Sequence, residues 1–282
     1  MIEGFRTNTY KDKFVTSLVN SVNGIIHPNT KTNISQYGLG EWPTFNFEKW
    51  TDKPVAVVGT LRGSEKVIWE AQKRKHTFLY MDHAYFHATR DYKDKGFGLL
   101  YRIIRSQMQL NYLVDLQQKD YKRIQRFKPI KVKTFHKSGR YILVLPPTQA
   151  IARLYDINYE QWLKETMNTI KKYTDRPIII RNKTEKTPLQ NQLKEAWAMV
   201  TYQSTAAIEA ITNGIPVFCD EICCVKPVAE TDFTKIEKPK YTDNDFRKKW
   251  IDSLLSCQFS MSEIESGVAY ETTMRLQNDN YA

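Results

Sequence analysis

Long hydrophobic runs are absent from this 282-residue sequence. No stretch approaches the roughly 20 consecutive apolar residues of a membrane-spanning helix, and the amino terminus lacks the basic-then-apolar order of a signal peptide. The chain also has no internal repeat and no low-complexity tract. Its 41% hydrophobic and 26% charged residues are the balance of an ordinary globular protein. We therefore expect a cytoplasmic protein without a membrane span.

Cysteine is scarce, and its placement argues against a disulfide framework. All four cysteines, Cys219, Cys223, Cys224 and Cys257, lie in the last third of the chain. Adjacent Cys223 and Cys224 do not form the Cys-x-x-Cys pairs of a zinc site, and no histidine lies near them. We expect no metal site here.

Several catalytic signatures are also missing. The sequence contains no Gly-x-Ser-x-Gly, no Gly-x-x-x-x-Gly-Lys and no His-Glu-x-x-His. These absences disfavour hydrolases and kinases.

Positive charge is in excess, and it is divided unevenly. Residues 1–140 hold 25 Lys and Arg against 12 Asp and Glu, a net +13, whereas residues 141–282 hold 17 against 19, a net −2. Such segregation favours contact between the first half and a polyanion, of which nucleic acid is the commonest. A membrane surface or an anionic polysaccharide would give the same bias, and so would a plain solvated surface. The residues we predict to bind nucleic acid are Arg62, Arg102, Arg105, Lys122, Arg123, Arg126, Lys128 and Lys131.

Short apolar runs alternate with amphipathic stretches along the chain. Strands are predicted at 54–58 and 77–81 with a helix capped by Ser64 between them, a helix at 10–22, a helical pattern over 98–125 and a hinge within 119–140. After residue 141 the pattern becomes regular, with strands at 141–145, 177–181, 198–202 and 215–219, and helices at 158–172, 188–195 and 204–212. This order predicts an α/β fold of two domains, 1–140 and 141–282, each with a parallel sheet. The terminal helix is a candidate to cross back to the first domain.

The segment from Val200 to Asp220, VTYQSTAAIEAITNGIPVFCD, is the most specific stretch. A strand stops at Gln203, and Ser204 and Thr205 open a helix whose free amides and positive dipole end would suit a diphosphate. Glu209 follows about one helical turn later, where its carboxylate could reach a sugar hydroxyl. The alternative is an ordinary helix, with Ser204 as its N-cap and Glu209 in solvent.

This segment resembles the donor-binding signature of GT-B glycosyltransferases. The Tyr141-to-Thr148, Ile178-to-Lys183 and Trp250-to-Gly267 segments resemble further motifs of capsule-type and phage-type members, in the same order, so the resemblance covers most of residues 141–270. It implies two Rossmann-like domains facing a central cleft, and a nucleotide-sugar co-substrate, by expectation a UDP-sugar. The donor-binding residues it implies are Thr148, Arg181, Lys183, Gln203, Ser204, Thr205 and Glu209.

The same resemblance implies a metal-independent enzyme without a bound cofactor. The Asp-x-Asp motif of metal-dependent transferases is missing, because the nearest match, Asp243-Asn-Asp245, follows no predicted strand and is interpreted as a loop or helix cap.

For the acceptor side, Asp82 and His83 are the candidate catalytic residues, since they follow a predicted strand of the first domain. In phage DNA glucosyltransferases, similar at fold level only, an aspartate activates the acceptor hydroxyl, which favours Asp82; His83 could equally be a structural histidine. Together with the basic first half, this predicts transfer of a sugar to a hydroxymethylated pyrimidine in double-stranded phage DNA. The alternatives are a transferase acting on a surface polysaccharide or glycolipid, and a binding protein without turnover.

Overall fold

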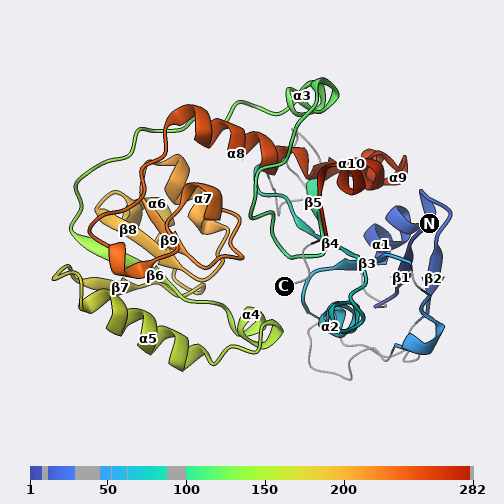
Figure 1. Ribbon diagram of the computed structural model, residues 1–282, viewed down its shortest axis with the longest axis horizontal. Coiled ribbons are helices and arrows are strands. Elements are labelled where there is room, and N and C mark those ends of the chain that lie inside the picture. Colours follow the sequence, from blue (N-terminus) through green and yellow to red (C-terminus); the bar gives the residue numbers. More distant parts are fainter. Residues whose placement is uncertain (8–11, 29–44, 52, 62, 88–99, 280–282) are drawn as a thin grey trace. The chain divides into compact units, whose positions relative to one another are not determined.

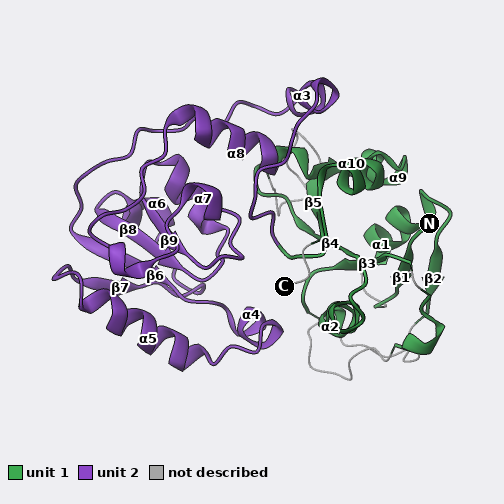
Figure 2. Ribbon diagram, in the orientation of Figure 1, with its two compact units in different colours: residues 1–108, 255–282 green, residues 109–254 purple. Residues whose placement is uncertain are grey.

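The protein is a mixed α/β molecule, and its computed structural model describes residues 1–7, 12–28, 45–51, 53–61, 63–87 and 100–279 (Figure 1). Arg62, one of the predicted nucleic-acid contacts, lies outside these residues. The chain forms two compact units (Figure 2). Unit 1 contains residues 1–108 and 255–282, and unit 2 contains residues 109–254.

Unit 1 is built on a six-stranded sheet with the order β10-β5-β4-β3-β1-β2. Its first four strands in the sequence, β1 to β4, run parallel, while β5 is antiparallel to β4 and β10 is antiparallel to β5. The strands are β1 (Glu3–Phe5), β2 (Ile25–His27), β3 (Val55–Val58), β4 (Phe78–His83), β5 (Leu100–Arg105) and β10 (Gln258–Ser260). The helices are α1 (Asp12–Asn20), η1 (Phe47–Lys49), α2 (Ser64–Arg74), α9 (Met261–Glu265) and α10 (Val268–Leu276).

The helical pattern predicted over 98–125 is wrong for most of that range. Leu100–Arg105 is the strand β5, buried on both faces between β4 and β10. The β-branched Ile103 and Ile104 suit that position, and the partner strand β10 comes from more than 150 residues later in the chain. Only α3 (Gln118–Ile124) is helical in the described part of the range.

The predicted cap of α2 is displaced by one residue. Gly63, with φ of 88°, occupies the N-cap position, and the Ser64 hydroxyl instead donates to the carbonyl of Val58 at 3.0 Å. A left-handed backbone at this turn explains the glycine.

Unit 2 has a four-stranded, fully parallel sheet with the order β7-β6-β8-β9. Its strands are β6 (Tyr141–Leu145), β7 (Ile178–Ile180), β8 (Ala196–Thr201) and β9 (Val217–Cys219). Its helices are α3, α4 (Gln149–Leu154), α5 (Tyr159–Lys171), α6 (Leu189–Leu193), α7 (Ala206–Thr212), η2 (Lys226–Val228), η3 (Phe233–Lys235) and α8 (Asn244–Ser256), the last of which runs to the boundary with unit 1.

The alternation predicted for residues 141–219 is confirmed, with element ends shifted by at most two residues. The helix-cap interpretation of Asp243 is also confirmed, because its Oδ1 accepts a hydrogen bond from the amide of Phe246 at 2.7 Å, in the first turn of α8.

The two units divide the chain differently from a boundary after residue 140. Residues 109–140 belong to unit 2, and residues 255–282 return to unit 1. Unit 1 therefore holds 17 Lys and Arg against 14 Asp and Glu, a net +3, while unit 2 holds 25 against 17, a net +8. The excess positive charge lies in the unit that also carries the Ser204-Thr205 segment. In the described residues, no helix combines the length and apolar character needed to cross a bilayer.

Candidate functional site

The carboxyl edge of the unit 2 sheet gathers the loops that carry the predicted donor residues. Because β6, β8 and β9 are parallel neighbours, the loops that follow them leave the same edge. Buried Thr201 joins two of these loops: its hydroxyl donates to the carbonyl of Leu145 at 2.7 Å and accepts from the amide of Ser204 at 3.3 Å. The sequence motif thus follows a strand whose end is tied to the neighbouring strand.

Ser204 and Thr205 lie just ahead of α7, which begins two residues later than expected. Thr205 occupies the N-cap position without a side-chain cap bond, and it is exposed. The Ser204 hydroxyl is half-buried and accepts from the amide of Ala206 at 3.3 Å. Glu209 is half-buried within α7. The first amides of α7 and the two hydroxyls are therefore close in the chain, as the anion-site hypothesis requires.

Gln203 is held by a residue that no sequence motif indicates, Gln109. Its backbone carbonyl accepts a hydrogen bond from Nε2 of Gln109 at 2.7 Å, and Oε1 of Gln109 accepts from the amide of Cys224 at 2.8 Å. Both glutamines are buried, and Oε1 of Gln203 has no hydrogen-bond partner in the described part of the chain. Gln109 therefore braces the loop after β8 against the turn after β9. A contact between residues 94 positions apart leaves no local pattern in the sequence.

Asp220 directly follows β9 and is a second residue that the prediction missed. Its amide donates to the carbonyl of Tyr202 at 3.1 Å, and its Oδ1 accepts from the amide of Ile222 at 3.3 Å. Burial raises the pKa of the half-buried Asp220 carboxyl, nearby Cys223 and Glu221 add to the rise, and the Ile222 hydrogen bond opposes it. A carboxyl group with a raised pKa at a strand end is a candidate for ligand contact or proton exchange.

Two aromatic side chains, Tyr155 and Tyr202, flank this edge with their ring centroids 5.9 Å apart. Burial is the main cause that raises the pKa of both phenols. A hydrogen bond with the Gln203 side chain opposes the shift at Tyr155. Both phenols are thus neutral groups that can donate or accept hydrogen bonds.

Of the remaining predicted donor residues at this edge, Thr148 and Arg181 already form hydrogen bonds, whereas Lys183 is exposed. Thr148 caps α4 by accepting from the amide of Ile151 at 3.4 Å. Arg181 follows β7, and its guanidinium donates to Oε1 of Gln192 at 2.5 Å. Lys183 lies on an exposed turn two residues farther along. A phosphate contact by Arg181 would have to compete with Gln192.

Three buried thiols lie at the end of β9 and in the turn that follows it. Cys219, Cys223 and Cys224 are fully buried thiols, and none of the three is in a disulfide within the described residues. Within the residues that the structure describes, no group of His, Cys, Asp and Glu side chains is arranged to hold a metal ion.

Asp82 and His83 lie at the end of β4 in unit 1, as predicted, and Asp82 belongs to a hydrogen-bonded network. Its Oδ2 accepts from the Tyr80 hydroxyl at 3.0 Å and from Arg102 at 3.1 Å, and its Oδ1 accepts from the His83 amide at 2.8 Å. The ring of half-buried His83 stacks 6.0 Å from that of Tyr101. The side chain of Asp82 is 28% exposed, so its carboxylate is held by hydrogen bonds but remains accessible to solvent.

The network also changes the interpretation of two arginines predicted to meet nucleic acid. Arg102 is buried and, besides Asp82, binds the carbonyl of His83. Arg105 is paired with Asp279 at 2.5 Å and lies only 18% exposed. Both arginines come from a strand rather than the predicted surface helix, so their charges are used inside unit 1.

The other predicted nucleic-acid contacts are in unit 2. Lys122, Arg126, Lys128 and Lys131 are exposed, and Arg123 is half-buried.

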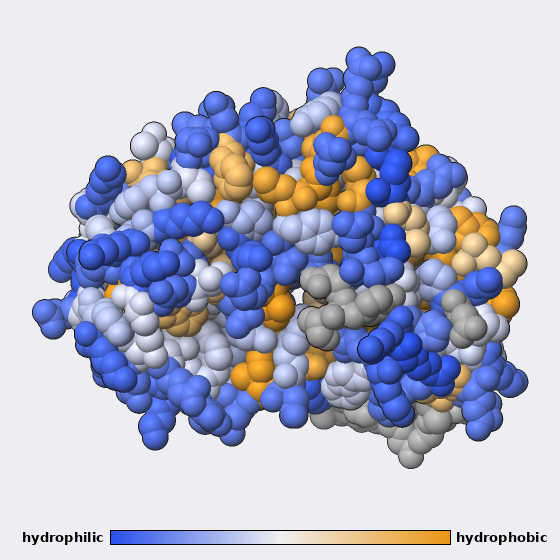
Figure 3. Space-filling model, in the orientation of Figure 1, coloured by the Kyte–Doolittle hydropathy of each residue, from blue (hydrophilic) through white to orange (hydrophobic). Residues whose placement is uncertain are grey.

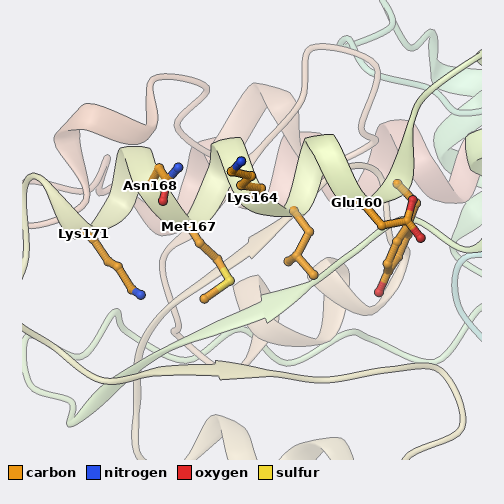
Figure 4. Close-up of a pocket in the computed structure, with 7 residues that line it drawn as sticks. Glu160, Lys164, Met167, Asn168 and Lys171 are labelled. Carbon is orange, nitrogen blue, oxygen red and sulfur yellow. The ribbon is translucent and has the colours of Figure 1, made fainter.

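An open groove of about 370 Å³ runs along α5 in unit 2 (Figure 4). Its lining comes from α5 alone, including Tyr159, Leu163 and Met167, and contains none of the predicted site residues. The groove is therefore lined by a single helix and does not include the loops at the carboxyl edge of the sheet.

No model of a protein family matches this chain, and no curated protein matches it. Among solved structures, the chain is similar to KpsC, the beta Kdo 2,4 transferase of Thermosulfurimonas dismutans, with 10% identity and a TM-score of 0.48 over 91% of this chain and 90% of that one. It is also similar to the beta Kdo 2,7 transferase of KpsC from the same organism, with 9% identity and a TM-score of 0.47 over 96% and 99%.

Proposed function

We propose that this protein is a GT-B glycosyltransferase that takes its sugar from a nucleotide-sugar bound at the carboxyl edge of the unit 2 sheet. The observation that carries the proposal is the Val200-to-Asp220 segment, which is a strand, loop, helix and strand in the motif's order, with its loop tied to the end of β6 through Thr201. Parallel α/β sheets bind ligands at this edge. The amides and hydroxyls at Ser204 and Thr205 would receive the diphosphate.

Transfer needs an acceptor hydroxyl close to a base. Asp82 and His83 are the proposed acceptor-side groups, since they end β4 and the Asp82 carboxylate keeps part of its surface open. In this proposal Arg102 orients Asp82. Asp220 is a further proposed donor contact, through a hydroxyl of the sugar or ribose.

For the acceptor we favour a surface polysaccharide or glycolipid over DNA. The argument for DNA depended on a basic first domain, yet unit 1 has a net charge of only +3 and uses Arg102 and Arg105 internally. The carboxyl-terminal motif from Trp250 to Gly267 supports a capsule-type acceptor by its resemblance. Its Glu263 forms a capping box with Ser260, and its Gly267 adopts φ of 84°.

Transfer to hydroxymethylated pyrimidines in duplex DNA is the second candidate function. It is favoured by the exposed Lys and Arg residues between 119 and 140 in unit 2, which suit a phosphate backbone.

The donor site is tested by calorimetric titration of a panel of nucleotide-sugars into the protein and into a Ser204→Ala/Thr205→Val variant. Losing hydrogen bonds to a charged phosphate should weaken binding by roughly tenfold or more. Thr169→Val, on α5, is the matched control and should bind as the wild type does. If no nucleotide-sugar binds the wild-type protein, the proposal fails.

The acceptor is identified by mass spectrometry after incubation with the donor that binds. Added hexose or pentose mass on a hydroxymethyl nucleoside would establish DNA transfer. Added mass on a glycan or glycolipid acceptor would establish transfer to a surface polysaccharide or glycolipid.

A further inference from the structure

Residues 119–140, here called the basic strip, are strongly charged and run along the outside of unit 2 from α3 to β6 (Figure 1). The strip contains nine Lys and Arg but a single acidic residue, Asp120. Asp120 is 2% exposed and is used inside α3, where its carboxylate accepts from the amide of Gln117 at 2.9 Å. The strip's exposed basic residues are Lys119, Lys122, Arg126, Lys128, Lys131, Lys133, Lys137 and Arg140. The strip therefore carries no exposed acid of its own.

The backbone of the strip is attached to unit 2, although most of it has no regular secondary structure. The amide of Lys133 donates to the carbonyl of Thr212 at 2.9 Å, and the amide of His136 donates to that of Gly214 at 3.0 Å. Phe135, between them, is buried. Because the main chain is held, the lysines project from a preformed surface, and less ordering entropy is lost when they meet a partner.

An exposed aromatic side chain accompanies the charges. Tyr121 lies on α3 between Lys119 and Lys122 and is 41% exposed, and the surface over α3 is hydrophilic (Figure 3). Tyrosine favours the boundary between lipid headgroups and acyl chains, while lysine stems extend so that the ammonium groups stay at the headgroups. Lys and Arg residues near a membrane surface are attracted to anionic lipid by about 1 kcal/mol each, and the strip has eight exposed basic residues.

We propose that the basic strip docks unit 2 onto an anionic phospholipid bilayer. The composition favours lipid over duplex DNA. Six of its eight exposed basic residues are lysines, which act as point charges, whereas planar arginine forks dominate base recognition. The aromatic residues Phe127 and Phe135 are buried, so they are not available to stack on bases.

This proposal goes beyond the proposed function, since it concerns where the chain binds and not what it transfers. It would bring the enzyme to a surface on which a lipid-linked acceptor is held.

The test is cosedimentation of the full chain with vesicles of equal parts phosphatidylglycerol and phosphatidylcholine, and with vesicles of phosphatidylcholine alone. The strip variant is Lys122→Gln/Lys131→Gln/Lys133→Gln. The matched control, Lys164→Gln/Lys171→Gln/Lys172→Gln, also removes three exposed positive charges from unit 2, but on and next to α5. Circular dichroism verifies that both variants are folded, and each is also titrated with a short DNA duplex.

We expect the wild-type chain to bind only the anionic vesicles, with salt-sensitive affinity. The strip variant should lose affinity on the order of 100-fold, from about fivefold per lysine near a charged surface, and the control should lose far less. Tyr121→Ser should weaken vesicle binding further.

The proposal is overturned if the wild-type chain does not bind anionic vesicles, or if strip and control variants lose affinity equally. It is also overturned if the strip variant loses only DNA affinity, which would support the second candidate function. Nucleotide-sugar titration of the same variants reports on the donor site separately, so failure of either proposal is recognised without the other.

Discussion

The ends of the strands in the two units use their polar side chains differently. In unit 1, Asp82 at the end of β4 forms an ion pair with Arg102, and the carboxylate of Glu3 in β1 contacts the imidazole of His27 in β2 at 2.5 Å, so each carboxylate has a ring or guanidinium partner. In unit 2, the loops after β6, β8 and β9 are joined by hydrogen bonds of Thr201 and Gln109 to the backbone, and Asp220 remains half-open. Hydrogen bonds from neutral side chains to the backbone leave the charge of Asp220 without an ion-pair partner among the described residues of unit 2, whereas the ion pair in unit 1 orients Asp82 and leaves part of its carboxylate exposed.

The largest expected effect tests the ion pair of unit 1. Arg102→Met would leave the Asp82 carboxylate without its guanidinium partner, and we expect the free energy of unfolding to fall by roughly 3 kcal/mol. Urea denaturation followed by circular dichroism measures this change. Asp82→Asn, which retains the hydrogen-bonding shape, serves as the comparison and should cost less.

Two outcomes would break the contrast between the units. If Arg102→Met lowers the free energy of unfolding by less than about 1 kcal/mol, the ion pair with Asp82 does not contribute substantially to stability. Abolished sugar transfer by Asp82→Asn, with stability unchanged, would support the acceptor-side role proposed for Asp82 and would show that its ion pair does more than stabilise unit 1.

The next effect concerns the neutral brace in unit 2. Gln109→Leu would leave the carbonyl of Gln203 and the amide of Cys224 unpaired in a buried place, at a cost of about 2 kcal/mol in stability. We also expect weaker nucleotide-sugar binding, because the loop at Ser204 loses its support. Gln161→Leu, on the exposed side of α5, is the control and should change stability by less than about 0.5 kcal/mol. If a folded Gln109→Leu variant binds the nucleotide-sugar with unchanged affinity, the hydrogen bonds of Gln109 do not support the donor site.

The smallest effect is a pH dependence at Asp220. Since burial raises the pKa of Asp220 in the folded protein above its ordinary value of 3.8, the folded state favours the protonated carboxyl. The stability this gives is present below the unfolded pKa and is lost as pH rises through the folded pKa. Asp220→Asn should therefore be slightly more stable than the wild type at neutral pH, by less than about 1 kcal/mol because the group is half-exposed.

Thermal unfolding of Asp220→Asn and the wild type at several pH values checks this prediction. The stability difference should shrink as the pH falls. A constant difference would mean that Asp220 is ordinarily solvated, and so would weaken its assignment to the donor site.

The sequence predicted residues 141–219 of unit 2 well because the elements there are regular and local. Strand 141–145 and helix 158–172 each follow one periodicity with clear caps, such as Asn158, whose side chain accepts from the amide of Gln161 at 2.9 Å. The candidate site was predictable to the same extent: Gln203, Ser204 and Thr205 could be selected because the motif is contiguous. Gln109 and Asp220 could not, since their roles depend on contacts and burial.

Unit 1 was harder because its sheet depends on distant pairing. The apolar and basic pattern around Leu100 to Arg105 suits either a helix face or a strand buried on both sides. The segment is a strand because β10 pairs with it in the sheet, with Gln258 opposite Arg102 in the register. That pairing also buried Arg102, which composition alone assigned to the surface.

By itself, the sequence determined the α/β class, the alternation of strands and helices between residues 141 and 219, and the strand, loop and helix around Ser204, because each depends on neighbours within one or two turns of chain. Only the tertiary structure decided that residues 109–140 belong to unit 2, that residues 255–282 return to unit 1, and that the basic excess therefore lies in unit 2. These outcomes depend on hydrogen bonds and packing between residues far apart in the chain, which no local pattern records.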